Sequence, residues 1–456
     1  MIASIRSGLG RLVNAREGEW TALLASFAYY FLTLSAYYIL RPIRDDMGVR
    51  GGVENLAWLF TGTLVGMLLL HPVYTALVSR LPRRKFVPYI NRFFILNLVA
   101  FFLLLRGVGD AQAVWVGRVF YIWVSVFNLF VVSVFWSLVT DVYRPEQSKR
   151  LFGFLAVGGT LGAMLGSTIT SLLVKPLGAL NLLLVSAVLL EVASQAARVL
   201  DGQEGKMAAA AREDAGAAAP AAVEQKRAEK IGGGVFEGVR HVLASPYLLG
   251  IALVMLFYTV SSTFVYFQQA ELTKQVFGDD SGRRTAFFAN VDLLVNAITL
   301  VGQLFVTSRV LRWLGVGAGL AFLPAISVVG FGVLAAAPSL AVLVGLQVAR
   351  RAGNFMVHRP AREVLYTVLS RTDKYKSKNF NDTFVYRVGD QAGAWAYTAI
   401  GWLGLGFTGV SLVMVPFCLA WVFVALWLGR RYRAVQAARE ERAAVAGAPV
   451  GAPAVA

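Results

Sequence analysis

Two arginines and two aspartates stand within six positions at the end of the first long apolar run of the sequence. The run from Trp20 to Leu40 has no charged residue, and Arg41, Arg44, Asp45 and Asp46 follow it at once. Guanidinium forks bind carboxylate and phosphate groups, and a charge at the bilayer centre costs about 2.5–3.5 kcal/mol on insertion scales. The spacing therefore predicts either a binding or gating site at the mouth of a membrane helix or a polar loop whose charges pair with one another.

Further polar residues interrupt other apolar segments. Asp292 and Asn296 are four residues apart and so share one face of a helix, which predicts a polar strip toward a cavity. Arg118 and Arg387 also lie inside apolar segments. An ionisable residue at membrane depth is a candidate functional residue. Two simpler interpretations stay open: Arg118 extends to the headgroups, and Arg387 forms a local ion pair with Asp390, one helical turn away.

The composition excludes several classes of protein. Of 456 residues, 57% are hydrophobic and only 15% are charged, which is too apolar for an ordinary soluble protein. The net charge of +17 lies mostly in alternate loops, as membrane orientation requires, and this argues against nucleic acid as a partner. A single cysteine and three scattered histidines give no disulfide framework and no metal-ligand spacing.

Recurring apolar stretches of about 20 residues, enough to cross about 30 Å of hydrocarbon, predict an all-α membrane protein with about twelve spans. The first follows Arg6, Arg11 and Arg16, is full-length and has no cleavage site, so we expect a span rather than a cleaved signal. Pro42 is expected to end or bend this first helix. The predicted spans are 20–40, 55–79, 88–105, 113–139, 151–174, 179–199, 247–269, 286–308, 316–337, 340–357, 384–405 and 408–429.

Lysine and arginine place alternate loops and both termini on the cytoplasmic side of what we expect to be the inner membrane. Residues assigned to these loops and to gating are Arg80, Arg83, Asp141, Arg309, Arg312, Arg362 and Glu363. Residues 1–199 and 246–430 are expected to form two six-helix bundles. Residues 200–245, of low complexity, are expected to be a cytoplasmic linker, and residues 431–456 a disordered cytoplasmic tail.

The two halves of the sequence resemble each other. VGGTLGA at Val157 matches VGDQAGA at Val388, SRLPR at Ser79 matches SRVLR at Ser308, and LRPIRDDMG falls on AELTKQVFG, which places Arg41 opposite Glu271. The three offsets, 231, 229 and 230 residues, are nearly the same. Each pair keeps its membrane side, so the pattern predicts two parallel six-helix repeats, as in major-facilitator transporters, which rock about a site near the midplane.

Three motifs carry a resemblance to a family. LRPIRDDMG resembles the Leu-Arg-x-x-Lys-Asp signature of the nucleotide-transporter (ATP/ADP translocase type) family, and RPAREVLY from Arg359 resembles its Asp-Pro-x-Lys-Glu-x-x-Tyr segment. Arg387-Val388-Gly389 resembles the start of its Arg-Leu-Gly-Lys-x-Gly-Gly helix. The resemblance implies nucleotide exchange, with basic side chains on the phosphates. Asp390 stands where the family has a lysine, and Tyr266 lies near the position of the family's acidic residue. These two departures imply a divergent member of the family.

We therefore expect a secondary transporter that works by alternating access, carries an organic anion and has no cofactor. The alternatives are a proton-coupled transporter of another small or amphipathic solute, and a non-transporting membrane scaffold or sensor. An enzyme is not expected, because no His/Asp, Ser/His or metal constellation occurs on one membrane side. The expected partners are a small-molecule substrate and the lipid bilayer. Predicted substrate contacts are Arg41, Arg44, Asp45, Arg118, Tyr266, Lys274, Asp292, Asn296, Arg387 and Asp390.

Overall fold

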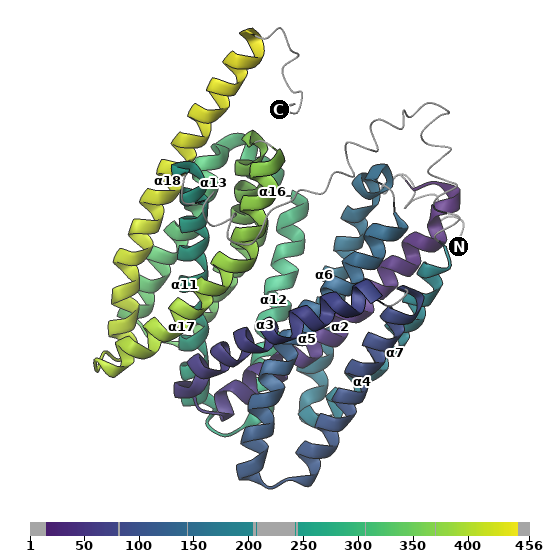
Figure 1. Ribbon diagram of the computed structural model, residues 1–456. Coiled ribbons are helices and arrows are strands. Elements are labelled where there is room, and N and C mark those ends of the chain that lie inside the picture. Colours follow the sequence, from purple (N-terminus) through teal and green to yellow (C-terminus); the bar gives the residue numbers. More distant parts are fainter. Residues whose placement is uncertain are drawn as a thin grey trace. The chain divides into compact units, whose positions relative to one another are not determined.

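The structure is a computed structural model that describes residues 15–80, 83–143, 145–203, 207, 242, 245–305, 307–369 and 371–445. Within these residues the secondary structure is helical and contains no strand (Figure 1). Ten helices of the described chain are long and apolar enough to cross a membrane. The prediction of an all-α, multi-pass membrane protein is confirmed. The chain divides into two compact units: Met1–Glu229 with Phe277–Asn296 (unit 1), and Lys230–Val276 with Ala297–Ala456 (unit 2).

Six long helices fill the first half of the chain. They are α2 (Trp20–Arg50), α3 (Leu56–Arg80), α4 (Arg83–Gly107), α5 (Asp110–Val142), α6 (Pro145–Leu177) and α7 (Ala179–Asp201). Short 3-10 turns, η1 (Glu17–Glu19) and η2 (Val53–Asn55), precede α2 and α3. Each predicted span of this half lies inside one of these helices, except that the span 55–79 begins one residue before α3. Long apolar runs favour helices because a helix satisfies its own backbone N–H and C=O groups in lipid. The proposed linker at 200–245 lies almost entirely outside the described residues.

The second half contains shorter, interrupted helices as well as long ones. The long helices are α11 (Pro246–Phe277), α12 (Ser281–Phe305), α13 (Thr307–Ala336) and α18 (Phe407–Val445). The interrupted ones are α14 (Leu340–Gly353), α15 (Arg359–Leu365), α16 (Arg371–Phe380) and α17 (Tyr386–Trp402), joined through the π-helical segments η3 (Asn354–His358) and η5 (Asn381–Val385) and the 3-10 turn η4 (Tyr366–Val368). Helix α18 continues to Val445. The prediction that residues 431–456 are disordered is therefore wrong for residues 431–445.

Helix α2 does not end at Pro42. It runs to Arg50, where Gly51 caps it by donating its backbone N–H to the carbonyl of Met47 at 2.9 Å. Of the two predicted effects of Pro42, a helix end is therefore wrong, and a bend stays a prediction. Membrane helices tolerate proline, since neighbouring helices and local adjustments can satisfy the freed carbonyl. The consequence is that the charged residues from Arg41 to Asp46 lie on a helix face rather than in a loop.

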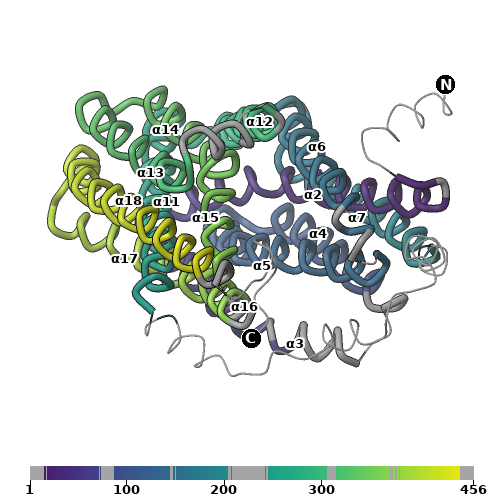
Figure 2. Tube along the Cα trace, turned by 90° about the horizontal axis from the view of Figure 1, so that it is seen from above, coloured from purple at the N-terminus to yellow at the C-terminus, as the bar shows by residue number. Residues whose placement is uncertain are grey.

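The same close contact recurs in both units between the first and fifth helix of each repeat. A Cβ on Gly158 or Gly162 of α6 would meet Phe27 or the backbone of Phe31 on α2. In unit 2, a Cβ on Gly389 or Gly393 of α17 would meet Thr259 or the backbone of Val260 on α11. Small residues allow such backbone contact in lipid. The third helix likewise lies beside the sixth in each unit, α4 against α7 and α13 against α18, so the predicted six-helix repeats are visible in the packing (Figure 2).

Replacing Gly162 by alanine is expected to destabilise the protein by about 1–3 kcal/mol, since overpacking a close contact costs that much. The new methyl group would meet the carbonyl oxygen of Phe31, which is backbone and cannot move aside. Gly153→Ala on the same helix is the matched control, because nothing lies within 4 Å of its added methyl group. Thermal unfolding in detergent should place G162A below and G153A at or above the wild-type midpoint; equal midpoints would contradict the packing.

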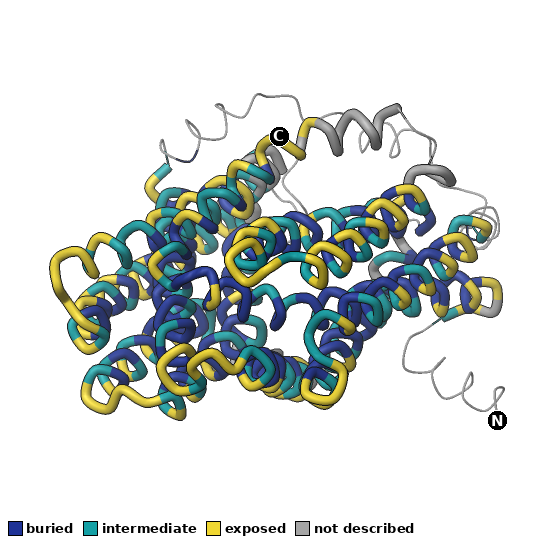
Figure 3. Tube along the Cα trace, turned by 90° about the horizontal axis from the view of Figure 1, so that it is seen from below, coloured by how far each residue is buried: buried dark blue, intermediate teal, exposed yellow. Residues whose placement is uncertain are grey.

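The buried residues of each unit form cores between their own helices, whereas large apolar side chains face outward. Phe120, Phe127 and Leu138 are fully buried in unit 1, and Trp421 is fully buried in unit 2. Leu69 and other large apolar side chains are exposed. Figure 3 shows exposed positions, in yellow, along many of the helices. An apolar exterior of this extent is typical of a surface that faces lipid.

Candidate functional site

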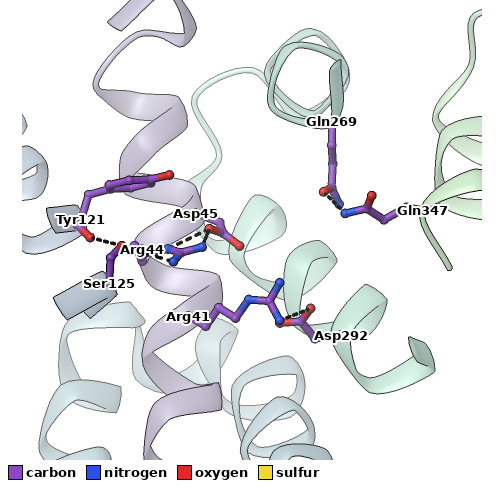
Figure 4. Close-up of polar contacts among 8 residues, drawn as sticks. All are labelled: Arg41, Arg44, Asp45, Tyr121, Ser125, Gln269, Asp292 and Gln347. Atoms are coloured by element: carbon purple, nitrogen blue, oxygen red, sulfur yellow. Dashed lines mark hydrogen bonds and ion pairs between the residues drawn. The ribbon is translucent and has the colours of Figure 1, made fainter. Parts of the chain in front are cut away.

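A layer of paired charges in unit 1 is the candidate site. It joins the C-terminal part of α2 to the N-terminal part of α12, which belongs to unit 1 up to Asn296. Arg41 on α2 forms an ion pair with Asp292 on α12, with 3.1 Å between Nη1 and Oδ1 (Figure 4). The Asp292 side chain is only 4% exposed and that of Arg41 19%. The structure thus brings together two of the predicted substrate residues, 251 positions apart in the sequence.

Arg44 lies one turn after Arg41 on the same helix face. Its Nε and Nη2 donate to Oδ1 of Asp45 at 3.0 and 2.6 Å, and its Nη1 donates to the hydroxyl of Ser125 on α5 at 3.4 Å. The guanidinium also lies over the ring of Tyr121, 5.1 Å from its centroid. The interpretation of neighbouring self-paired charges is therefore correct for Arg44 and Asp45, although they occupy a helix (Figure 4).

A second pair between α2 and α12 was not predicted from the sequence. Nε of Arg284 donates to Oδ1 of Asp46 at 2.6 Å, and the hydroxyl of Ser281 donates to Oδ2 of the same carboxylate. Both charged side chains are 2–3% exposed. Arg284 also donates to the carbonyl of Gly278. The sequence signal was an arginine, Arg284, directly before the predicted span 286–308.

The formal charges of this layer cancel. Three arginines, Arg41, Arg44 and Arg284, each pair with one aspartate. A low-dielectric interior explains the arrangement, because an ionised group without a partner there costs several kcal/mol.

Two other predicted residues lie elsewhere in unit 1. Arg118 donates from Nη2 to the carbonyl of Gly51 at 2.9 Å, so it caps the C-terminus of α2, where positive charge is favourable. Its guanidinium stacks on the ring of Trp115 at 4.5 Å. Asn296 is buried, 8% exposed, one turn beyond Asp292, and its Nδ2 has no hydrogen-bond partner in the described part of the chain. Asn296 stays a candidate, and Arg118 is better explained as a cap.

The predicted residues of unit 2 do not form one cluster. Arg387 pairs with Asp390 at 3.4 Å, so the local ion pair is the arrangement present. Tyr266 is half-buried, and Lys274 is exposed in the last turn of α11. Sequence reasoning missed two buried polar contacts in this unit. Gln347 donates to Gln269 at 2.9 Å (Figure 4), and Arg350 is held by serine hydroxyls that include Ser261 at 2.8 Å.

The structure describes the side chains of only some of the residues assigned to cytoplasmic loops and gating. Arg362 pairs with Asp382 at 3.5 Å and Glu363 pairs with Lys378 at 2.6 Å, both in unit 2. Asp141 is exposed near the end of α5. Arg80, Arg83, Arg309 and Arg312 lie on helices, but their side chains fall outside what the structure describes. Among the described residues, no group of three or more His, Cys, Asp or Glu side chains could hold a metal ion.

The start of α2 is fixed by a buried carboxylate. Glu19 is fully buried and accepts hydrogen bonds from Arg150 at 2.8 Å and from Gln147 at 3.1 Å, both on α6. Burial by itself raises the pKa of the Glu19 carboxyl. The hydrogen bonds from Arg150, the backbone N–H of Arg16 and Gln147 outweigh it, so this pKa lies below its ordinary value.

The Glu19 carboxylate makes the free energy of unfolding depend on pH. Because the pKa of Glu19 is lower in the folded protein, its contribution is complete above about pH 4.3 and is lost as the pH falls through the folded-state pKa. Glu19→Gln is expected to lower stability by about 1–3 kcal/mol at neutral pH and to flatten the acid limb of a plot of unfolding temperature against pH. The control is Glu54→Gln, an exposed carboxylate; identical curves for both variants would contradict the role given to Glu19.

Comparisons with known proteins agree with this architecture. The sequence profile described as the Major Facilitator Superfamily matches residues 10–358. A bacterial homologue of the iron transporter ferroportin, in an inward-facing state, is 14% identical with a TM-score of 0.60 over 90% of this chain and 98% of that one. The xylose transporter XylE from E. coli, in an inward-open conformation, is 12% identical with a TM-score of 0.57 over 89% and 95%.

A peptide transporter, POT, solved in complex with sulfate, is 13% identical with a TM-score of 0.57 over 90% of this chain and 95% of that one. At these identities the likeness concerns the fold. No curated protein matches this chain significantly in sequence.

Proposed function

The chain belongs to the Major Facilitator Superfamily, and from that premise we propose that it is a secondary transporter of an organic anion, bound through Arg41 and Arg44. It is an integral, multi-pass membrane protein, and we place it in the inner membrane with both termini cytoplasmic, because the positive loops lie on that side. The proposed substrate carries a carboxylate or phosphate group.

One observation carries this proposal. Arg41 meets Asp292 through a single nitrogen, Nη1. In the part of the chain that the structure describes, its Nε and Nη2 have no hydrogen-bond partner. The planar guanidinium fork matches the two oxygens of a carboxylate or phosphate group. The remaining edge of Arg41, partly exposed, can therefore receive an anion while the ion pair with Asp292 holds the side chain in place.

The paired charges of this layer suit transport better than tight, permanent binding. An anion on the free edge of Arg41 shares the guanidinium with Asp292, and its departure leaves the pair of Arg41 and Asp292 intact. The empty site therefore holds no unbalanced charge in a low-dielectric interior. A counter-anion that replaces the substrate on Arg41 provides a route to exchange.

Nucleotides are the specific form of this proposal. The resemblance of LRPIRDDMG to the nucleotide-transporter signature places Arg41 and Arg44 at positions where that family binds phosphate. A dicarboxylate would use the same fork. The two classes of anion differ in charge and in the nucleobase, and direct competition therefore separates them.

The decisive experiment is counterflow in proteoliposomes that hold unlabelled solute inside and labelled solute outside. Labelled ATP and a labelled dicarboxylate are tested in parallel, with a hydrophobic cation as the third class. We expect accumulation of an anion. Accumulation of the cation alone would favour the alternative, a transporter of amphipathic solutes, and no accumulation of any class together with no thermal stabilisation would favour a scaffold.

A further inference from the structure

A stripe of buried polar residues runs along unit 2. Asn354, His358 and Arg362 are spaced four residues apart along η3 and α15, and Asn381 joins them from η5 (the polar stripe). Their exposed fractions are 6%, 0%, 6% and 1%. Four polar side chains buried to this degree need an explanation, because buried polar groups are normally hydrogen-bonded throughout.

The π-helical turns explain why the stripe stays on one face. In an α-helix, residues four apart drift steadily around the axis, because a turn takes 3.6 residues. The wider π turn of Asn354–His358 opposes that drift, so His358 and Arg362 remain aligned with Asn354. A second π turn, Asn381–Val385, carries the remaining member. Single π turns within α-helices are rare and occur frequently at functional sites.

Each residue of the polar stripe is held on one side, in two cases by a tyrosine. Arg362 donates from Nη1 to Sδ of Met255 and forms an ion pair through Nη2 with Asp382. Nδ2 of Asn354 donates to the hydroxyl of Tyr258 at 3.0 Å, and Nδ2 of Asn381 donates to the hydroxyl of Tyr366 at 3.1 Å. Nδ1 of His358 lies 3.2 Å from the carbonyl of Leu320. A carbonyl can only accept, so Nδ1 carries the proton and Nε2 of the neutral ring is an acceptor.

The opposite side of each residue has no partner among the described residues. The atoms concerned are Oδ1 of Asn354, Nε2 of His358, Oδ1 of Asn381 and Nε of Arg362. Three of these atoms accept hydrogen bonds and one donates. Leaving such a group buried and unsatisfied costs about 1–3 kcal/mol. The stripe therefore has the composition of a binding site rather than of a finished core.

These four atoms without a partner determine which class of ligand fits the polar stripe. Three acceptor lone pairs repel an anion, and a cation cannot accept the hydrogen bond that Nε of Arg362 offers. A hydroxyl group both donates and accepts, so it satisfies the acceptors and the donor alike, whichever way the two amides are turned.

We propose that the polar stripe is a binding site for hydroxyl groups, supplied by the O–H groups of a polyhydroxylated neutral solute or of ordered water molecules. Buried water commonly makes about three hydrogen bonds to groups of this kind. Asp382, 39% exposed and paired with Arg362, marks where the stripe meets the surface. The site is independent of the anion proposed for unit 1, and its test does not use transport.

Two measurements on the purified full chain distinguish the sources. In the first, thermal unfolding is followed with increasing sorbitol or myo-inositol at millimolar concentration, and with betaine, which has no O–H group, as the control for general solute effects. A saturable upward shift with a polyol but not with betaine shows a solute site. Asn354→Leu and Asn381→Leu should each remove the saturable shift, whereas Asn97→Leu, outside the stripe on α4, should keep it.

In the second measurement, radiolytic hydroxyl labelling reports on bound water. Tyr366, 1% exposed, contacts the stripe, and Phe127, 0% exposed, lies in an apolar core. Several-fold faster labelling of Tyr366 than of Phe127, without a polyol shift, shows that water supplies the hydroxyls. Equal labelling of both rings together with no saturable polyol shift would overturn the proposal. Both leucine variants serve this purpose, so the misfolding of one still leaves a test.

Discussion

Arg41→Gln is expected to reduce the rate of anion uptake into proteoliposomes by about 10- to 100-fold, since hydrogen bonds to charged groups contribute about 1.5–3 kcal/mol. Glutamine keeps much of the length and polarity of the side chain but removes the charge and the planar fork. Arg41→Lys keeps the charge and loses only the fork, so its uptake should fall between wild type and R41Q. The measurement is initial uptake at equal membrane yield.

The partner on α12 separates the binding role of Arg41 from its structural role. R41Q removes the guanidinium 3.1 Å from the buried carboxylate of Asp292, and breaking a buried pair costs about 3–5 kcal/mol. The double variant Arg41→Gln/Asp292→Asn no longer holds an ionised carboxylate there. We expect it to recover thermal stability but not uptake. Uptake that recovers along with stability would remove Arg41 from the substrate site.

A surface pair provides the matched control for this first prediction. Arg92 lies 3.6 Å from Glu191, and both side chains are 40–47% exposed. Exposed pairs of this kind contribute about 0–1 kcal/mol. Arg92→Gln should therefore leave both uptake and the unfolding midpoint close to wild type. A loss of uptake as large as that of R41Q would mean that any lost positive charge has the same effect.

Arg284→Met is expected to lower the free energy of unfolding by about 3–5 kcal/mol, because it leaves the buried carboxylate of Asp46 without its charged partner. Both side chains of the pair are nearly inaccessible, with 2.6 Å between Nε and Oδ1. Asp46→Asn/Arg284→Met should recover most of this loss, as replacing both members of a buried pair is often close to neutral. The measurement is the shift in denaturant midpoint in detergent for each single variant and for the double variant.

The corresponding exposed pair shows how much burial contributes. Lys378 and Glu363 approach to the same 2.6 Å, but their side chains are 37–38% exposed. Glu363→Gln should therefore change the free energy of unfolding by about 0–1 kcal/mol. If Glu363→Gln and Arg284→Met had equal effects, or if the double variant lost as much as the two single variants together, burial of the Asp46–Arg284 pair would not explain its contribution.

The sequence alone determined the fold class, the approximate spans and the two repeats. These features follow from local properties. About 20 apolar residues cross the hydrocarbon, and a helix satisfies the hydrogen-bonding N–H and C=O groups of the backbone in lipid. The glycines at Gly158 and Gly389 recur at matching positions of the two repeats, and a missing side chain permits close helix contact wherever such a helix lies. The polar strip of Asp292 and Asn296 could likewise be read from helical periodicity, since four residues nearly complete a turn.

Tertiary structure alone decided which charges meet. The pairs Arg41–Asp292 and Asp46–Arg284 join residues more than 230 positions apart. No spacing rule predicts such partners, because the contact depends on how α2 packs against α12. The continuation of α2 past Pro42 and the π turns under the polar stripe were also absent from the sequence prediction. Both depend on neighbouring helices that satisfy backbone groups which an isolated segment would leave exposed. Hydropathy sets where the helices lie along the chain, and packing sets the environment of each charge.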